Sequence, residues 1–296
     1  VVYNTAQFLA MCAVHYYCFE QIWSEINPMP LYSATMKSCI EKKTEITKGG
    51  AVYNSTSFSL IGIGTFIDSL YAIQKTVFED RRYTLDYLKE MIKADFQGYE
   101  ADRQYLMNKL PKYGQPDAGV DKLAKQVFHD LAKHSSGMPN PRGGYYEASL
   151  FAFFFYDFVK ENTWATPDGR HAGQRISRGC NPGETSENID AATLMNSLRS
   201  IDMAEYPGCG VTYLEMPVSQ TDTDVALFEY VLSAFVHCGG SALDFNVVDK
   251  DKLIKAKENP DQYRNLVVRV CGYSAPFISL SEELQDEIIQ RALRNG

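Results

Sequence analysis

An apolar run leads into a single glycine near the carboxyl end of this 296-residue sequence. Residues 266–270 are mostly apolar and β-branched, Gly272 follows them, and Tyr273 and Phe277 come next. Glycine reaches positive φ angles without strain, so the pattern predicts a strand that ends in a tight turn. A last helix with an apolar face begins near Ser281. The end of the chain is therefore predicted to be a strand, a turn and a helix that packs on them.

The string from Arg269 to Phe277 resembles the radical loop of the glycyl radical enzymes, in which Arg-Val-(small residue)-Gly-Tyr precedes a phenylalanine. Gly272 stands where that family carries its radical, which implies that Gly272 is the catalytic residue. The resemblance extends to the rest of the loop, namely Arg269, Val270, Cys271, Tyr273, Ser274 and Phe277. Glycine suits this chemistry because the amide nitrogen and the carbonyl both delocalise an unpaired electron on a planar Cα.

Two further segments carry the same resemblance, in the order in which the family has them. Residues 49–54 read Gly-Gly-Ala-Val-Tyr-Asn, and residues 166–173 read Thr-Pro-Asp-Gly-Arg-His-Ala-Gly. Because Pro-Asp-Gly is a turn sequence on physical grounds alone, we interpret the second segment as a structural turn rather than a catalytic site. Gly62 and Gly64 lack the third glycine and the surrounding strand and helix of a dinucleotide loop. We therefore expect no cofactor-binding residues in the chain.

The sequence also departs from the family pattern at two places. Asp244 stands where the family usually has glutamine, and residues 176–183 differ from the longer glycine- and serine-rich loop of better-known members. The Tyr-Ser pair after Gly272 and the Leu-Gln-Asp-Glu-Ile stretch of the last helix look more like the lyase, dehydratase and decarboxylase branch. The substrate and the reaction subtype stay open, and a formate acetyltransferase-like activity is the alternative to a lyase or dehydratase.

The resemblance implies an α/β fold: part of the family's strand barrel surrounded by helices, with a carboxyl-terminal glycyl radical domain. We expect residues 1–173 to form the carboxyl-terminal part of the pyruvate formate-lyase-like barrel domain and residues 174–296 the glycine radical domain. Gly272 is expected on a buried loop inside the barrel, because an apolar run and a helix flank it.

Local patterns predict elements within that fold. Strands are expected at 211–216 and 242–248, and Thr84 is expected to cap a helix. The first helix, from 6 to 26, is predicted to place Phe8 and His15 on its packed face.

The resemblance further implies a radical-SAM activating enzyme as partner, which carries S-adenosylmethionine and an iron–sulfur cluster and removes a hydrogen atom from Gly272. The stored radical then passes to a cysteine, whose thiyl radical starts cleavage, elimination or decarboxylation of a small organic substrate in anaerobic metabolism. We expect a homodimer in the full enzyme, and neither a bound cofactor nor a metal on this chain.

The family's catalytic cysteine usually lies in a Gly-Cys-x-Glu string, and no such string occurs here. Since the sequence begins at Val1, we expect it to be the carboxyl-terminal portion of a longer enzyme, with that cysteine outside it. The alternative is a non-catalytic accessory or repair subunit that supplies the glycyl radical to another chain. A purely structural barrel fragment would leave the Gly272 motif unexplained.

Composition limits the partners and the compartment. The net charge is −8, from 37 acidic and 29 basic residues without a basic tract, so we expect no nucleic-acid partner. Seven cysteines without a CxxC pair indicate a reducing compartment rather than a disulfide scaffold. The apolar stretch at 145–159 contains Glu147 and Asp157 and is too short to span a bilayer. We therefore expect a cytoplasmic protein without a membrane partner.

Overall fold

The computed structural model describes residues 2–153, 155, 159–185, 190–217, 222–270 and 272–294. The chain forms two compact units, and each draws on separate stretches of sequence. The first comprises Val1–Leu60, Gln126–Leu150 and Asp202–Cys209, and the second comprises Ile61–Lys125, Phe151–Ile201 and Gly210–Gly296. The predicted domain division after residue 173 stays a prediction.

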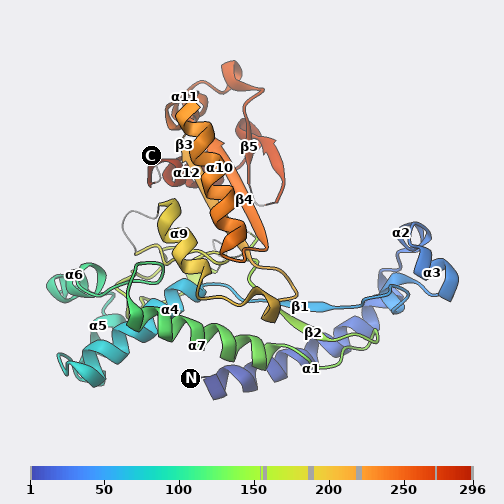
Figure 1. Ribbon diagram of the computed structural model, residues 1–296, viewed down its shortest axis with the longest axis horizontal. Helices are drawn as coiled ribbons and strands as arrows, with labels where there is room; N and C mark the ends of the chain where they lie inside the picture. The colour runs from blue at the N-terminus through green and yellow to red at the C-terminus, as the bar shows by residue number, and fades with distance from the viewer. Residues whose placement is uncertain are drawn as a thin grey trace. The chain divides into compact units, whose positions relative to one another are not determined.

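The first unit combines helices with a short parallel sheet (Figure 1). Its elements are α1 (Val2–Ile26), α2 (Pro30–Ala34), α3 (Lys37–Lys42), η1 (Ile46–Lys48), β1 (Thr56–Ser59), β2 (Tyr146–Ser149), η4 (Met203–Glu205) and the second half of α7 (Ala118–Ser135). Strands β1 and β2 pair in parallel, with Thr56 opposite Tyr146. The double glycine at 49–50 lies shortly before β1.

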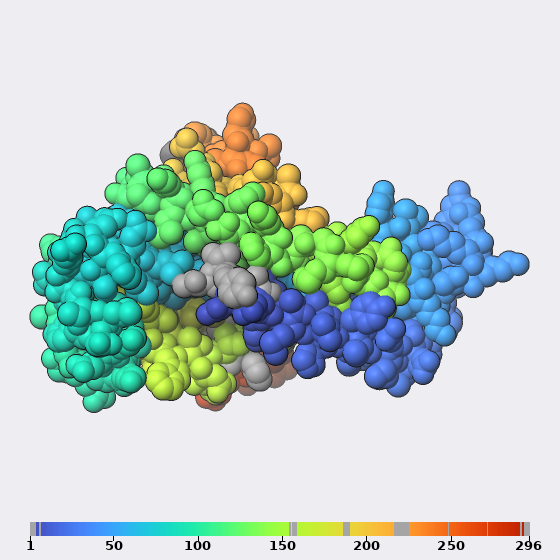
Figure 2. All heavy atoms as spheres, turned by 90° about the horizontal axis from the view of Figure 1, so that it is seen from below, coloured from blue at the N-terminus to red at the C-terminus, as the bar shows by residue number. Residues whose placement is uncertain are grey.

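The core of the first unit lies between α1 and this sheet. Leu9 and Ala13 of α1 are buried together with Phe58 and Tyr146, whose rings stack at 5.1 Å between centroids. In Figure 2 the dark blue α1 runs beside the yellow-green segment that contains β2. The predicted face of α1 is wrong: Phe8 is 64% exposed and His15 is exposed. The helix turns Leu9 and Ala13, which are smaller, toward the sheet.

The second unit holds most of the helices and two further strand pairs. Its helices are α4 (Ile63–Ile73), which continues as the π-helix η2 (Gln74–Glu79), α5 (Leu85–Lys93), α6 (Glu100–Asn108), the first half of α7, η3 (Lys160–Asn162), α9 (Ala191–Leu198), α10 (Asp222–His237), α11 (Lys250–Glu258), η5 (Pro260–Tyr263), η6 (Phe277–Ser279) and α12 (Glu282–Arg294). Its strands are β3 (Val211–Pro217), β4 (Ala242–Val248), β5 (Val267–Arg269) and β6 (Ser274–Pro276). Thr84 caps α5 as expected, since its hydroxyl accepts the Tyr87 N–H at 3.1 Å.

Strands β3 and β4 pair in parallel, with Val211 opposite Ala242. Parallel neighbours need a crossover connection, and α10 provides it. It lies along β4 (Figure 1), where the Phe228 and Phe245 rings approach to 4.7 Å between centroids. Both strands agree with the predicted ranges.

Among the residues that the structure describes, no helix combines the length and the apolar character needed to cross a membrane.

Candidate functional site: the Gly272 hairpin

The candidate radical glycine lies at the turn of a β-hairpin. Strands β5 and β6 pair antiparallel, with Val268 opposite Ala275 and Arg269 opposite Ser274. Beyond the last strand pair, the Val270 N–H donates to the Tyr273 carbonyl at 2.9 Å. Gly272 has φ +76°, the left-handed region in which glycine alone is unstrained. The strand and turn predicted from the sequence are therefore confirmed.

The base of the hairpin is anchored by apolar packing. Val268, Val270 and Phe277 are at most 3% exposed. They share one buried cluster with residues of the two flanking helices, Leu253 and Ala256 of α11 and Ile288, Ile289 and Ala292 of α12. Burying side chains of this size stabilises by about 1.5–3 kcal/mol each. The last helix thus holds the hairpin at its base, as its apolar face predicts.

The tip of the hairpin is exposed, so the expectation that Gly272 is buried is wrong for this chain. Gly272 is exposed, Tyr273 is 45% exposed, and a Cβ built on Gly272 would meet no atom within 4 Å. The reason is geometric. The apolar residues behind that expectation, Val268 of β5 and Val270 just after it, precede the turn, and their packing ends there.

Strand β4 supplies the polar contacts to the hairpin. Asp244 and Asn246 are two residues apart, so they share one face of the strand. The Gly272 N–H donates to Asp244 Oδ2 at 3.0 Å, and Arg269 Nε lies 3.8 Å from Asp244 Oδ1. Asn246 Nδ2 donates to the Arg269 carbonyl at 3.4 Å. The carboxylate therefore contacts both the backbone and a side chain of the turn.

The structure brings most of the predicted loop residues together on this hairpin. Arg269, Val270, Gly272, Tyr273, Ser274 and Phe277 all lie on β5, the turn, β6 or the first residue of η6, whereas Cys271 lies outside the described residues. The prediction from the sequence included Asp244 only as a departure from the family pattern. It missed Asn246, although two polar side chains spaced by two residues in an apolar strand signal a shared contact face.

A second cluster of charged groups is buried within the second unit. Asp68 on α4, Lys112 and Asp168 are each at most 2% exposed. Asp68 Oδ1 accepts the Tyr113 N–H at 2.7 Å, and Lys112 Nζ donates to the Asp168 carbonyl at 3.0 Å. Burial, partly offset by the Lys112 charge, raises the pKa of Asp68 from 3.8 to about 7. A proton on this carboxyl therefore titrates near neutral pH.

Hydroxyl groups hold the other carboxylate. Asp168 Oδ1 accepts from Ser69 at 3.3 Å and from Thr166, and its Oδ2 accepts from Thr185 at 2.9 Å. Each such bond to a charged group contributes about 1.5–3 kcal/mol. Asp168 thus anchors the 166–173 turn, whose middle residue Gly169 has φ +98°.

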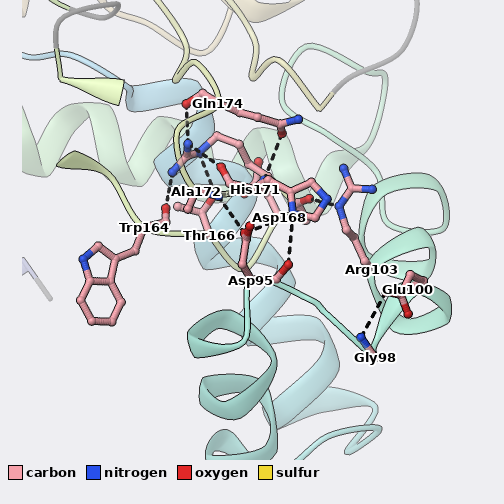
Figure 3. Close-up of polar contacts among 12 residues, drawn as sticks. Asp95, Gly98, Glu100, Arg103, Trp164, Thr166, Asp168, His171, Ala172 and Gln174 are labelled. Carbon is pink, nitrogen blue, oxygen red and sulfur yellow. Dashed lines mark hydrogen bonds and ion pairs between the residues drawn. The ribbon is translucent and has the colours of Figure 1, made fainter. Parts of the chain in front are cut away.

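Contacts around the same turn extend to the helices beside it (Figure 3). Asp95 Oδ1 accepts the Ala172 N–H at 2.8 Å and lies 3.1 Å from His171 Nδ1, while Arg103 Nε donates to the Gly169 carbonyl at 2.8 Å. The side chains of Asp95 and Arg103 thus both bind residues of the 166–173 turn. The described part of the chain brings together no group of three or more His, Cys, Asp or Glu side chains that could hold a metal ion. The geometry therefore supports the interpretation of this segment as a structural turn.

Comparisons with known proteins identify the family. A family model described as "Pyruvate formate lyase-like" matches residues 3–156, and one described as "Glycine radical" matches residues 176–278. A glycine radical domain implies a radical carried by the protein itself. Gly272 and the loop residues around it lie inside the second match.

Curated and solved relatives agree with these matches. The trans-4-hydroxy-L-proline dehydratase of Clostridioides difficile is 33% identical over 92% of this chain and 35% of its own length. The isethionate sulfite-lyase of Bilophila wadsworthia is 31% identical over 88% of this chain and 32% of its own. The solved B12-independent glycerol dehydratase from Clostridium butyricum matches with a TM-score of 0.88 at 29% identity, over 96% of this chain and 36% of its own.

The chain thus spans about a third of the length of the relatives that it matches. Its agreement with their solved structures confirms the predicted fold class, a mixed helix and strand fold with a glycine radical domain. The chain belongs to the pyruvate formate lyase-like family of glycyl radical enzymes.

Proposed function

We propose that this chain stores a radical on Cα of Gly272 and passes it to a cysteine of a glycyl radical enzyme. The observation that carries the proposal is the radical-loop motif, which occupies a hairpin turn within the matched glycine radical segment. Residues 1–173 then form the end of the barrel domain and residues 174–296 the glycine radical domain.

We propose that an activating enzyme installs the radical on Gly272. A radical-SAM activating enzyme holds S-adenosylmethionine and an iron–sulfur cluster, and a carbon radical generated there takes one hydrogen atom from Gly272. One C–H bond breaks on the glycine and one forms on the activating enzyme's radical. The unpaired electron remains between the amide nitrogen and the carbonyl of Gly272.

The reaction class follows from the relatives. They include a trans-4-hydroxy-L-proline dehydratase, a glycerol dehydratase and an isethionate sulfite-lyase, each of which acts on a small organic molecule. We propose radical elimination or cleavage of a small organic substrate, by a cytoplasmic homodimer that works without oxygen.

Oxygen cleavage tests the proposal directly. Dioxygen adds to a carbon radical and breaks the main chain beside it, so activated protein exposed to air should release a carboxyl-terminal piece that begins near Tyr273. Mass spectrometry locates the break. The Gly272→Ala variant should stay intact under the same treatment. Cleavage at another residue, or equal cleavage of the variant, would overturn the assignment of Gly272.

The second candidate is an accessory subunit that supplies the glycyl radical to another chain. Both candidates accommodate the lack of a Gly-Cys-x-Glu string among these 296 residues, because each places the catalytic cysteine on other residues. The test is to add the activated chain to a glycyl radical enzyme whose own radical loop has been cut by oxygen. Restored turnover with the wild type but not with Gly272→Ala supports this role. No restoration favours the first candidate.

A further inference from the structure

The backbone amide of the radical glycine is held by a carboxylate from a neighbouring strand. Asp244 of β4 is nearly buried, with 10% of its side chain exposed, although the turn that it contacts is exposed. Its two oxygens divide the contacts: Oδ2 accepts the Gly272 N–H, and Oδ1 faces Arg269 Nε. Asn246 adds a bond to the Arg269 carbonyl from the same face of β4. Two side chains on one face of β4 therefore contact Arg269 and Gly272.

We infer that Asp244 is a positioning residue for the radical at Gly272, which holds the left-handed turn and polarises the glycine amide. This inference rests on the proposed function. Gly272 has no side chain and no apolar contact of its own within 4 Å of a Cβ position, so packing does not fix it. The hydrogen bond from its N–H is what ties it to the core strand.

The charge on Asp244 matters as well as the bond. Hydrogen bonds to an ionised acceptor are roughly twice as strong as bonds between neutral groups. A carboxylate on the N–H also pushes electron density onto the amide nitrogen. The nitrogen donates electron density to the radical centre and so helps to delocalise the unpaired electron. The carboxylate therefore favours a radical at Gly272. An asparagine at this position would keep one oxygen for the Gly272 N–H, would lose the oxygen that faces Arg269, and would lose this effect.

Selective labelling makes the contact measurable in the chain as it stands. Glycines that follow cysteine are Gly210, Gly239 and Gly272. Protein labelled with ¹³C-carbonyl cysteine and ¹⁵N-glycine therefore gives three amide signals that carry the carbon coupling. Gly210 N–H donates to the Ser241 hydroxyl and Gly239 N–H to the Val236 carbonyl, so both serve as internal controls with neutral acceptors.

Two variants separate the bond from the charge. In Asp244→Ala, the Gly272 amide proton should shift upfield and exchange with solvent about tenfold faster, which corresponds to about 1.4 kcal/mol. In Asp244→Asn, which keeps an acceptor, the exchange should rise only about threefold. The Gly210 and Gly239 signals should not move, which shows that the fold is intact. A Gly272 signal that is the same in all three proteins would overturn the inference.

A second readout tests the electronic role after activation. The electron paramagnetic resonance signal of Asp244→Asn should show smaller nitrogen hyperfine coupling and a radical that decays several-fold faster without oxygen than in wild type. Identical signals and lifetimes would overturn the polarising role. If wild type forms no radical while the amide signal still depends on Asp244, the proposed function fails and the contact stands. If the radical forms but the Gly272 amide signal is the same in wild type and the Asp244 variants, the proposed function stands and the positioning role fails.

Discussion

Replacing Asp68 by asparagine should remove a pH dependence of stability from the second unit. The carboxyl of Asp68 is 2% exposed, and burial raises its pKa from 3.8 to about 7. The folded state therefore binds a proton that the unfolded chain releases. For a raised pKa, the contribution to stability is complete below the unfolded value and is lost as the pH rises through the folded value. Asparagine stays neutral and keeps an oxygen that can accept the Tyr113 N–H.

The magnitude follows from the size of the shift. Each unit of pKa difference corresponds to about 1.4 kcal/mol, so a rise of roughly three units gives about 4 kcal/mol in total. Between pH 5 and pH 8 the free energy of unfolding should fall by about 3 kcal/mol, because roughly two units of the shift are lost in that window. The Lys112 charge favours the ionised carboxylate and so lowers the pKa of Asp68. The value of about 7 already includes this contribution.

Urea unfolding at pH 5 and pH 8 measures this difference for wild type and for Asp68→Asn. The quantity compared is the change in unfolding free energy between the two pH values. Any pH-independent effect of the substitution on stability cancels in this comparison. The wild type should lose about 3 kcal/mol more than the variant over this range. Asp86→Asn, which changes a side chain that is 89% exposed, is the matched control and should follow the wild type. Equal pH dependence in wild type and Asp68→Asn would refute the buried titration.

Substitutions at three further positions test a close contact, a helix cap and a backbone conformation. Gly64→Ala would place a Cβ 2.6 Å from the Asn181 carbonyl oxygen and 3.0 Å from the Gly183 nitrogen; chemical denaturation should show a loss of about 1–3 kcal/mol, and unchanged stability would contradict this close approach. Thr84→Ala should cost about 1 kcal/mol because α5 loses its N-cap, whereas Thr84→Ser should retain most of it. Gly272→Ala should cost only about 1–2 kcal/mol from its positive φ, because open space surrounds the added methyl group; circular dichroism that shows an unfolded variant would contradict this.

The secondary structure was largely predictable because local patterns determine it. The alternation in 242–248 and the N-cap Thr84 both gave elements that the structure contains. Which face of a helix packs against its neighbours was less predictable. The first helix is apolar on more than one side, so periodicity alone could not decide between the face of Phe8 and the face of Leu9. The sheet beside α1 made that choice, through contacts distant in sequence.

The residues of the candidate site that belong to a contiguous motif were predictable from the sequence. The residues that reach the site from distant parts of the chain were not. Gly272 and its neighbours follow from a contiguous string, but its exposure depends on where the packing of Val270 ends. Asp244 reaches the turn only because β4 lies beside the hairpin, 28 positions away in sequence. The effect of the Lys112 charge on the pKa of Asp68 likewise depends on the tertiary fold.

Electron paramagnetic resonance of the activated protein shows whether Gly272 carries the radical. A radical on Cα of Gly272 couples to the one remaining Cα hydrogen and should give a doublet. In protein grown with α-deuterated glycine, that doublet should collapse to a single line, and Gly272→Ala should give no organic radical signal. A doublet that survives deuteration, or an unchanged signal in Gly272→Ala, would place the radical elsewhere and contradict the account.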